Sequence, residues 1–323
     1  MISYVLRRLV QTVIVIIILS YLCFGLMNLM PGDPVELMIS SNPKITAEDV
    51  VRLREFYGLD TPIYKKYFKW VSDLTQGELG YSRVYRIPVT EMIGPSLRAT
   101  VILSLSSLIL SLLIGIPLGI WCALKPNTKV DYTINFFSFA GISMPSFWLG
   151  IVLIIIFSVK LGWLPAGGYQ TTGLNYQSWW DEVLDKGKYL ILPVVSLSIQ
   201  SIGRFSRFAR SAMLEAMRND FIRTARAKGL SRQVVIWRHG FRNALIPLIT
   251  IVAISLSSIF SGALITETLF AYPGAGRLIY SSIMGNDYNV AMISFVISIS
   301  MVLIMNLMAD LLYGVVDPRI SYN

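Results

Sequence analysis

The residues with the greatest capacity for chemistry lie in one basic segment that separates two apolar stretches. From Arg204 through Arg242 the chain contains ten Lys or Arg residues and two Asp or Glu residues. Cations at this density favour ionic recognition of an anionic lipid surface or of a protein. The first chemistry that the sequence indicates is therefore docking rather than catalysis.

The residue patterns of common catalytic and metal sites are missing from the sequence. No Gly-x-x-x-x-Gly-Lys-Ser/Thr phosphate loop occurs, so the chain itself is not expected to hydrolyse nucleotide. The single histidine, His239, argues against a Ser-His-Asp hydrolase and excludes a histidine-rich metal site. Cys23 and Cys122 fall in apolar runs, where cysteine is typically a small buried hydrophobe. We therefore expect no catalytic residue, no metal site, no bound cofactor and no enzymatic activity; a membrane-anchored enzyme has no support.

The composition predicts a polytopic α-helical membrane protein. The 323 residues are 54% hydrophobic and 15% charged, and the mean hydropathy is +0.60. A soluble domain of this length needs a larger polar coat than this. Several runs reach the ~20 apolar residues that cross a bilayer, whereas a transmembrane barrel would show ~10-residue alternating segments. The net charge of +9 is concentrated in loops between spans, so nucleic acid is not an expected partner.

The apolar runs predict six transmembrane helices. Their expected positions are about 9–30, 99–123, 133–159, 190–209, 244–266 and 290–314. The first run is too long for a signal peptide and is expected to be a retained helix. The fourth is the weakest, because Arg204, Arg207 and Arg210 follow it at three-residue spacing. A charge at mid-membrane costs ~2.5–3.5 kcal/mol, so these arginines are expected at the interface, on a helix that leaves the bilayer.

Three regions follow from this pattern: an N-terminal transmembrane helix over 1–30, an extramembrane segment over 31–98, and a core over 99–323. The segment 31–98 contains nine basic and nine acidic residues, so it has no net charge bias. Thr46 and Asp49 can cap a short helix there. A second helix after Pro62 is expected to have an apolar side made by Tyr64, Tyr67, Phe68 and Trp70. Pro88 to Arg98 is expected to be an amphipathic lead-in to the next span.

The charge distribution predicts the orientation of these helices. With six spans, both termini lie on one side together with the loops 124–132 and 210–243. Segments 160–189 and 267–289 on the other side contain four basic and five acidic residues. The positive-inside rule then places both termini and the basic segment in the cytoplasm, and the segment 31–98 on the extracytoplasmic side.

Within the basic segment, residues 219–243 predict two short helices. Asn219 or Asp220 can cap the first, and Gly229 suits the position just after its C-terminus. Ser231 can cap the second, and Pro247 is expected to mark entry into the fifth span. The residues alone leave two interpretations open. The helix pair could lie on anionic lipid, or it could dock a protein.

The same segment carries a resemblance to a known family. The run from Phe221 to Leu230, followed by His239 and by Arg242-Asn243-Ala244-Leu245-Ile246-Pro247, resembles the cytoplasmic loop of ABC-importer permeases of the dipeptide/oligopeptide class. The likeness extends along the chain to Arg7-Arg8-Leu9, Pro31-Gly32-Asp33-Pro34, Met144-Pro145-Ser146-Phe147-Trp148, Thr266-Glu267-Thr268-Leu269-Phe270, Pro273-Gly274, Gly276, Asp310-Leu311-Leu312-Tyr313 and Asp317-Pro318-Arg319. It is greatest for the B-type permease subunit.

This resemblance implies a type I ABC-importer permease fold in a bacterial or archaeal plasma (inner) membrane, and transport of a peptide. It implies pairing with a second, homologous permease, delivery by an extracytoplasmic substrate-binding protein, and two cytoplasmic ATPase subunits that use ATP. It implies that the segment couples to the ATPases through Asp220, Arg223, Thr224, Ala225, Arg226, Ala227, Lys228 and Gly229. The general importer pattern here is Glu-Ala-Ala-x-x-x-Gly; this chain keeps Gly229 but has Arg223 in place of the glutamate.

Candidates for the translocation pathway or its gate come from polar residues in or beside the last two spans. They are Ser255, Ser258, Ser261, Glu267 and Asp310. Serines line pathways but also pack helices, and Asp310 could equally be an interfacial or paired structural residue. Gly115 and Gly119 could allow close helix contact, although general small-residue packing is an alternative.

Two alternative functions remain open at this stage. An ABC permease for nickel, glutathione or another small solute would share these motifs. A stand-alone secondary transporter would show buried charge pairs and an internal repeat. Only Asp310 lies within a span, and no matching halves occur.

Overall fold

The computed structural model describes residues 2–28, 46, 49, 52, 61–257, 259 and 263–316. Within these ranges the secondary structure is helical, and the only β pairing is an isolated bridge between Tyr81 and Pro88. The predicted all-α class is confirmed.

Five helical stretches of the described chain are long and apolar enough to cross a membrane. They comprise α1 (Ile2–Asn28), α5 (Val89–Leu124), α8 (Trp179–Arg218), the stretch Arg232–Leu256 that ends in α11 (Arg242–Ser257), and α14 (Tyr288–Val316). A sixth crossing is available from a bent pair made by α6 (Lys129–Ser143) and by α7 (Ser146–Leu153) with the π-helical η1 (Ile154–Lys160).

The third span, expected over about 133–159, is not one continuous helix, because its two halves meet at an angle of 101°. Met144 lies between them with φ −82° and ψ 128°, an extended conformation. Contact with the proline ring disfavours the helical region for the residue before a proline, and Pro145 supplies that contact. Gln200 of α8 donates its side-chain amide to the Met144 carbonyl at 2.5 Å, which satisfies an acceptor that the break exposes.

The helices α5 and α8 form the central packed pair and run in the same direction. Ser107 and Ser198 are hydrogen-bonded at 3.1 Å. Further along both helices, a Cβ atom added to Gly119 would lie 2.2 Å from the Ser206 carbonyl oxygen. Gly115 is similarly close to Ile202, so the two glycines confirm the predicted close contact. Because α5 and α8 are parallel, the segment between them must return the chain, which makes the bent pair the third crossing.

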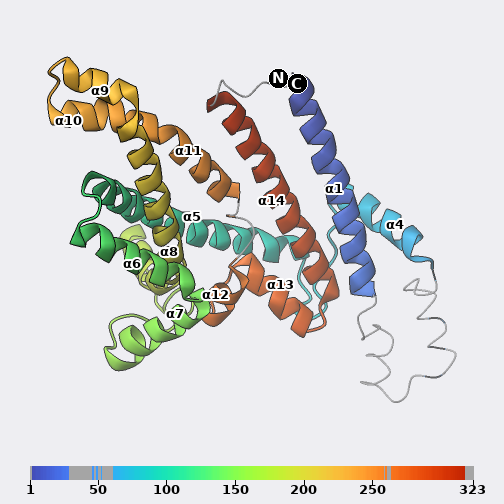
Figure 1. Ribbon diagram of the computed structural model, residues 1–323. Coiled ribbons are helices and arrows are strands. Elements are labelled where there is room, and N and C mark those ends of the chain that lie inside the picture. Colours follow the sequence, from blue (N-terminus) through green and yellow to red (C-terminus); the bar gives the residue numbers. More distant parts are fainter. Residues whose placement is uncertain are drawn as a thin grey trace.

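The length of α8 confirms that the fourth span continues beyond the bilayer. It contains 40 residues, or ~60 Å at 1.5 Å per residue, about twice the hydrocarbon thickness. Figure 1 shows α9 beyond its C-terminal end, together with the start of α1 and the end of α14. This end of the molecule is called the α9 end below. The opposite end, where α5 and α8 begin, is called the α13 end.

At the α13 end, a helix after the first span packs back onto the core. In α4 (Ile63–Thr75) Tyr67 is buried and its hydroxyl lies 2.7 Å from Ser20 Oγ of α1. Tyr64 and Phe68, expected on the apolar side, are exposed instead. The predicted lead-in over Pro88 to Arg98 is the first part of α5 itself, since that helix starts at Val89.

Thr46 and Asp49 make the predicted hydrogen bonds, and most of the helix that they were expected to cap lies outside the described residues. Thr46 Oγ1 donates to Asp49 Oδ2 at 2.7 Å, and the Asp49 amide donates back to Thr46 Oγ1 at 3.3 Å. The hydrogen bonds from Thr46 lower the pKa of Asp49 below its usual range.

Candidate functional site: a coupling helix and a polar cavity

The coupling segment begins with a short exposed helix, α9 (Asp220–Ala227), directly after α8. Asn219 occupies the N-cap position in an extended conformation, but its side chain donates to the Glu215 carbonyl and makes no cap hydrogen bond. Gly229 has φ +75°, and its amide donates to the Arg226 carbonyl at 3.0 Å. The predicted glycine position after the helix is confirmed, because this left-handed conformation favours glycine.

One face of α9 is packed and the other is exposed. Ile222 and Ala225 are buried, and Ile222, Ala225 and Val235 form one small core with Met217 packed against it. The other predicted coupling residues are exposed: Asp220, Arg223, Thr224, Arg226, Ala227, Lys228 and Gly229. Ala225 therefore anchors the helix, and the remaining positions are available to a partner.

The expected second helix is not separate from the fifth span. After Gly229 the chain turns through α10 (Arg232–Val234) and the π-helical η2 (Val235–Phe241), and continues into α11 without a break. Pro247 lies inside α11 rather than at its entrance. Ser231 stands at the N-cap position but makes no side-chain cap bond. Consequently α9 is connected at each end to a membrane-crossing helix.

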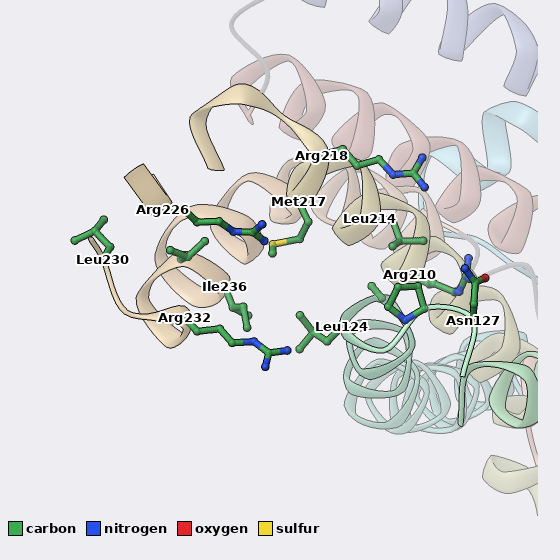
Figure 2. Close-up of a pocket in the computed structure, with 13 residues that line it drawn as sticks. Leu124, Asn127, Arg210, Leu214, Met217, Arg218, Arg226, Leu230, Arg232 and Ile236 are labelled. Carbon is green, nitrogen blue, oxygen red and sulfur yellow. The ribbon is translucent and has the colours of Figure 1, made fainter. Parts of the chain in front are cut away.

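A cavity of about 750 Å³ lies between α9, α10, α8 and the end of α5. Figure 2 shows Arg226 and Arg232 directed into it, beside Met217, Ile236 and Leu124. Arg210 and Arg218 also line it, and its described lining contains no carboxylate. The α9 end thus combines an apolar wall with several cations.

One ion pair at this end was not predicted from the sequence. Arg210 of α8 binds Asp131 of α6 through two hydrogen bonds of 2.7 Å each, and the Asp131 side chain is only 3% exposed. Asn127 and Asn135 also donate to this carboxylate. The cap of α6, in which Thr128 accepts from the Asp131 amide, could be inferred from neighbouring residues. The ion-pair partner of Asp131 could not, because Arg210 lies 79 positions away.

A second cavity, of about 640 Å³, lies among α5, α7, α8, α11 and α12 (Leu264–Leu269). Its polar lining is given by Ser104, Ser107, Ser146, Gln200, Ser201, Arg204, Ser255 and Thr266. Of the predicted pathway residues, Ser255 lies here. Ser258 and Ser261 fall outside the described residues, and Asp310 lies in α14 with its side chain outside the described part. We refer to this space as the polar cavity.

Glu267 lies beside the polar cavity but does not line it. Its carboxylate is completely buried, accepts a hydrogen bond from Thr100 Oγ1 at 2.7 Å, and accepts the Arg277 amide at 3.0 Å. Arg277 lies in the first turn of α13 (Ala275–Met284), so the acid is placed at a positive helix terminus. A Cβ atom on Gly274 would lie 2.2 Å from this carboxyl group, so only glycine fits there. In this arrangement Glu267 joins α5, α12 and α13.

Two further carboxylates at the α13 end are, like Glu267, buried and held by several hydrogen-bond donors. Asp287 accepts from Ser82 Oγ and from the amides of Arg83 and Val84. Asp185 accepts from the amide and hydroxyl of Thr171 at 2.8 and 2.6 Å, and from the Tyr176 hydroxyl at 2.8 Å. Loss of solvent, and then the hydrogen bond to Asp185, raise the pKa of Tyr176 to about 12.

The comparisons with known proteins agree with this geometry. Residues 115–322 match the family described as binding-protein-dependent transport system inner membrane component, and residues 1–104 match the N-terminal region of such membrane components. The chain belongs to this family. As a member, it is a multi-pass membrane protein, as predicted.

Relatives of this family member match it over their full length. The oligopeptide transport system permease protein AppB of Bacillus subtilis is 41% identical over 323 residues, covering 100% of both chains. The dipeptide transport system permease protein DppB of Escherichia coli K12 is 34% identical, covering 100% of this chain and 99% of that protein. The predicted resemblance to dipeptide/oligopeptide permeases is confirmed. Both relatives are named as permease proteins of transport systems.

The fold is also found in a solved structure. A chain of the MetNI methionine ABC transporter in inward-facing conformations superposes with a TM-score of 0.57 at 17% identity, covering 71% of this chain and 97% of that chain. The predicted type I permease-like fold is supported by this match.

Proposed function

We propose that this chain is a transmembrane permease subunit of an ATP-driven importer of dipeptides or oligopeptides, and that it forms half of the translocation pathway. The observation that carries the proposal is the exposed face of α9, anchored by Ile222 and Ala225 at the end of α8. The full-length similarity to named peptide permeases supports the substrate class.

The proposed assembly contains a homologous second permease, two cytoplasmic ATPase subunits and an extracytoplasmic substrate-binding protein. ATP is used by the ATPase subunits, and this chain binds neither cofactor nor nucleic acid. The exposed cations of α9 and the absence of carboxylates from the described lining of the cavity behind it support an anionic protein surface as the docking partner.

The proposed mechanism is a population shift between inward- and outward-facing arrangements. ATP-driven closure of the motor biases this equilibrium only to the extent that α9 fits the closed motor differently from the open one. Because α9 packs on Met217 of α8 and Val235 of η2, a displacement of α9 must move α8 and α11 with it.

Gly229 provides the test of coupling. Proline cannot adopt φ +75° and has no amide to donate to Arg226, so Gly229→Pro should abolish ATP-coupled uptake or ATPase assembly. Gly229→Ala, whose Cβ meets open space, should retain most uptake at a cost of ~1 kcal/mol from the backbone conformation. Both variants are compared in proteoliposomes with the partner subunits. Wild-type uptake by a stably inserted Gly229→Pro protein would contradict the docking role.

Orientation is tested by labelling. With both termini cytoplasmic, a tag at Asn323 should be inaccessible to an impermeant reagent in intact cells and should react after permeabilisation. A tag placed next to Gly173, in an exposed loop at the α13 end, should react in both conditions. Labelling of the Asn323 tag from outside intact cells would show that the topology is the reverse of the one proposed.

A further inference from the structure

Arg204 lies beside the apolar run of α5. It lies between Gly203, which contacts the Ser138 carbonyl of α6, and Phe205, which packs against Gly115 of α5. Gly115 lies within the apolar run 99–123, about four residues from its middle, or ~6 Å along the helix axis. Arg204 is therefore nearer to the middle of this apolar run than to its end.

The three arginines of this part of α8 differ in their partners. Arg210 is neutralised by Asp131 through two hydrogen bonds. The guanidinium of Arg207 lies over the Phe139 ring at 4.2 Å, and Arg207 does not line the polar cavity. Arg204 donates to Ser201 Oγ at 2.9 Å, and no carboxylate among the described residues pairs with it.

Arg204 also lines a neighbouring cavity of about 710 Å³, in which the carboxylate of Asp131 is held by Arg210. The polar cavity provides a binding space for this cation. Its described lining supplies hydroxyl and amide groups from Ser104, Ser107, Gln200, Ser201 and Ser255, with Arg204 as the charged group and no Asp or Glu. An ionisable group on a membrane-crossing helix is by default a functional candidate. A guanidinium fits a carboxylate with two parallel hydrogen bonds.

From these observations we propose that Arg204 binds the free C-terminal carboxylate of the peptide as it crosses the polar cavity. This inference rests on the proposed peptide-import function. The cavity volume of about 640 Å³ accommodates a short peptide, and the serine hydroxyls and the Gln200 amide can bind its main-chain groups. A site on a transport pathway must also release its ligand. A single ion pair between Arg204 and the peptide carboxylate, with only neutral groups around it, binds weakly enough to allow release.

The test measures protection of a reporter thiol in the purified permease–ATPase complex, without the binding protein. Ser104→Cys places the thiol in the polar cavity on α5, opposite α8, and leaves the Arg204–Ser201 hydrogen bond intact. Modification by N-ethylmaleimide is followed with trialanine and with its C-terminal amide. The parent protein is the background control, because Cys23 and Cys122 are buried.

With Arg204 present, trialanine should give half-protection at about a tenfold lower concentration than its amide, which converts to about 1.4 kcal/mol. The preference should vanish in Ser104→Cys/Arg204→Gln and persist in Ser104→Cys/Arg207→Gln. Equal protection by both peptides with Arg204 present, protection by neither up to their solubility limits, or loss of the preference in the Arg207 variant would overturn the proposal. Uptake of trialanine by the wild-type transporter in proteoliposomes tests the import function separately, so the two failures are distinguishable.

Discussion

The charged residues of the α13 end and those of the α9 end are used in opposite ways. At the α13 end, Asp185, Glu267 and Asp287 are buried and each accepts at least two hydrogen bonds. At the α9 end, Arg223 and Asp220 approach to 3.5 Å with side chains that are 82% and 94% exposed. The first set holds the fold together, and the second is available for recognition.

The difference follows from where each charge can be solvated. A buried carboxylate is tolerable only when donors replace the water it has lost, and removing it leaves those donors unsatisfied. An exposed ion pair of the Arg223–Asp220 kind contributes ~0–1 kcal/mol. Asp131–Arg210 is the exception at the α9 end, since it is a buried pair that joins α6 to α8.

The largest expected effect on stability comes from Glu267→Ala. Thr100 and the Arg277 amide would lose their acceptor within a closed environment, at a cost of about 1–3 kcal/mol for each group. We expect a clear fall in the midpoint of thermal unfolding of the detergent-solubilised protein. Glu267→Gln keeps an acceptor and should cost less. Equal stability of the alanine variant and wild type would show that Glu267 is not structural and would favour the predicted gate role.

A smaller loss is expected from Asp131→Ala at the α9 end. Breaking a fully buried pair costs ~3–5 kcal/mol, but the Arg210 side chain is 28% exposed, so solvent screening should reduce the loss to about 2 kcal/mol. Asp131→Ala/Arg210→Ala should be less damaging than the sum of the two single variants. Additive unfolding shifts in this double-mutant cycle would contradict a coupled pair.

The smallest effect on stability is expected from Arg223→Gln. Because the side chain is exposed, its unfolding midpoint should correspond to a change within ~0.5 kcal/mol. Association with the ATPase subunits, measured by co-purification, should nevertheless weaken. Lys188→Gln removes an exposed cation at the α13 end and should leave association unchanged. If only the Lys188 variant lost association, the α13 end rather than the α9 end would be the surface that docks the ATPase subunits.

Local sequence patterns predicted the features that depend on short stretches of chain. The apolar runs indicated the spans, the Thr46–Asp49 spacing indicated a cap, and Gly229 indicated the end of α9. Each of these depends on the conformation of a few consecutive residues. The family resemblance was also recognisable, because its motifs are local.

Features that depend on residues far apart in the chain were not predicted. The Asp131–Arg210 pair and the Thr100–Glu267 hydrogen bond join positions 79 and 167 residues apart. The position of Arg204 along α5 depends on where two distant helices cross, which charge spacing alone does not give. The break at Met144 could not have been inferred from Pro145 alone, because Pro117, Pro193 and Pro247 lie inside continuous helices.

The parallel contact of α5 and α8 has a mechanical consequence. The two backbones touch at Gly115 and Gly119, so the helices cannot slide past each other without displacing main-chain atoms, and together they form a stiff lever. α8 is ~60 Å long, and a tilt of about 5° moves one end by ~5 Å relative to the other. The contact lies nearer to the α9 end of α8 than to Trp179, so about this pivot a push on α9 gives a larger movement at the far end, with no helix needing to unwind.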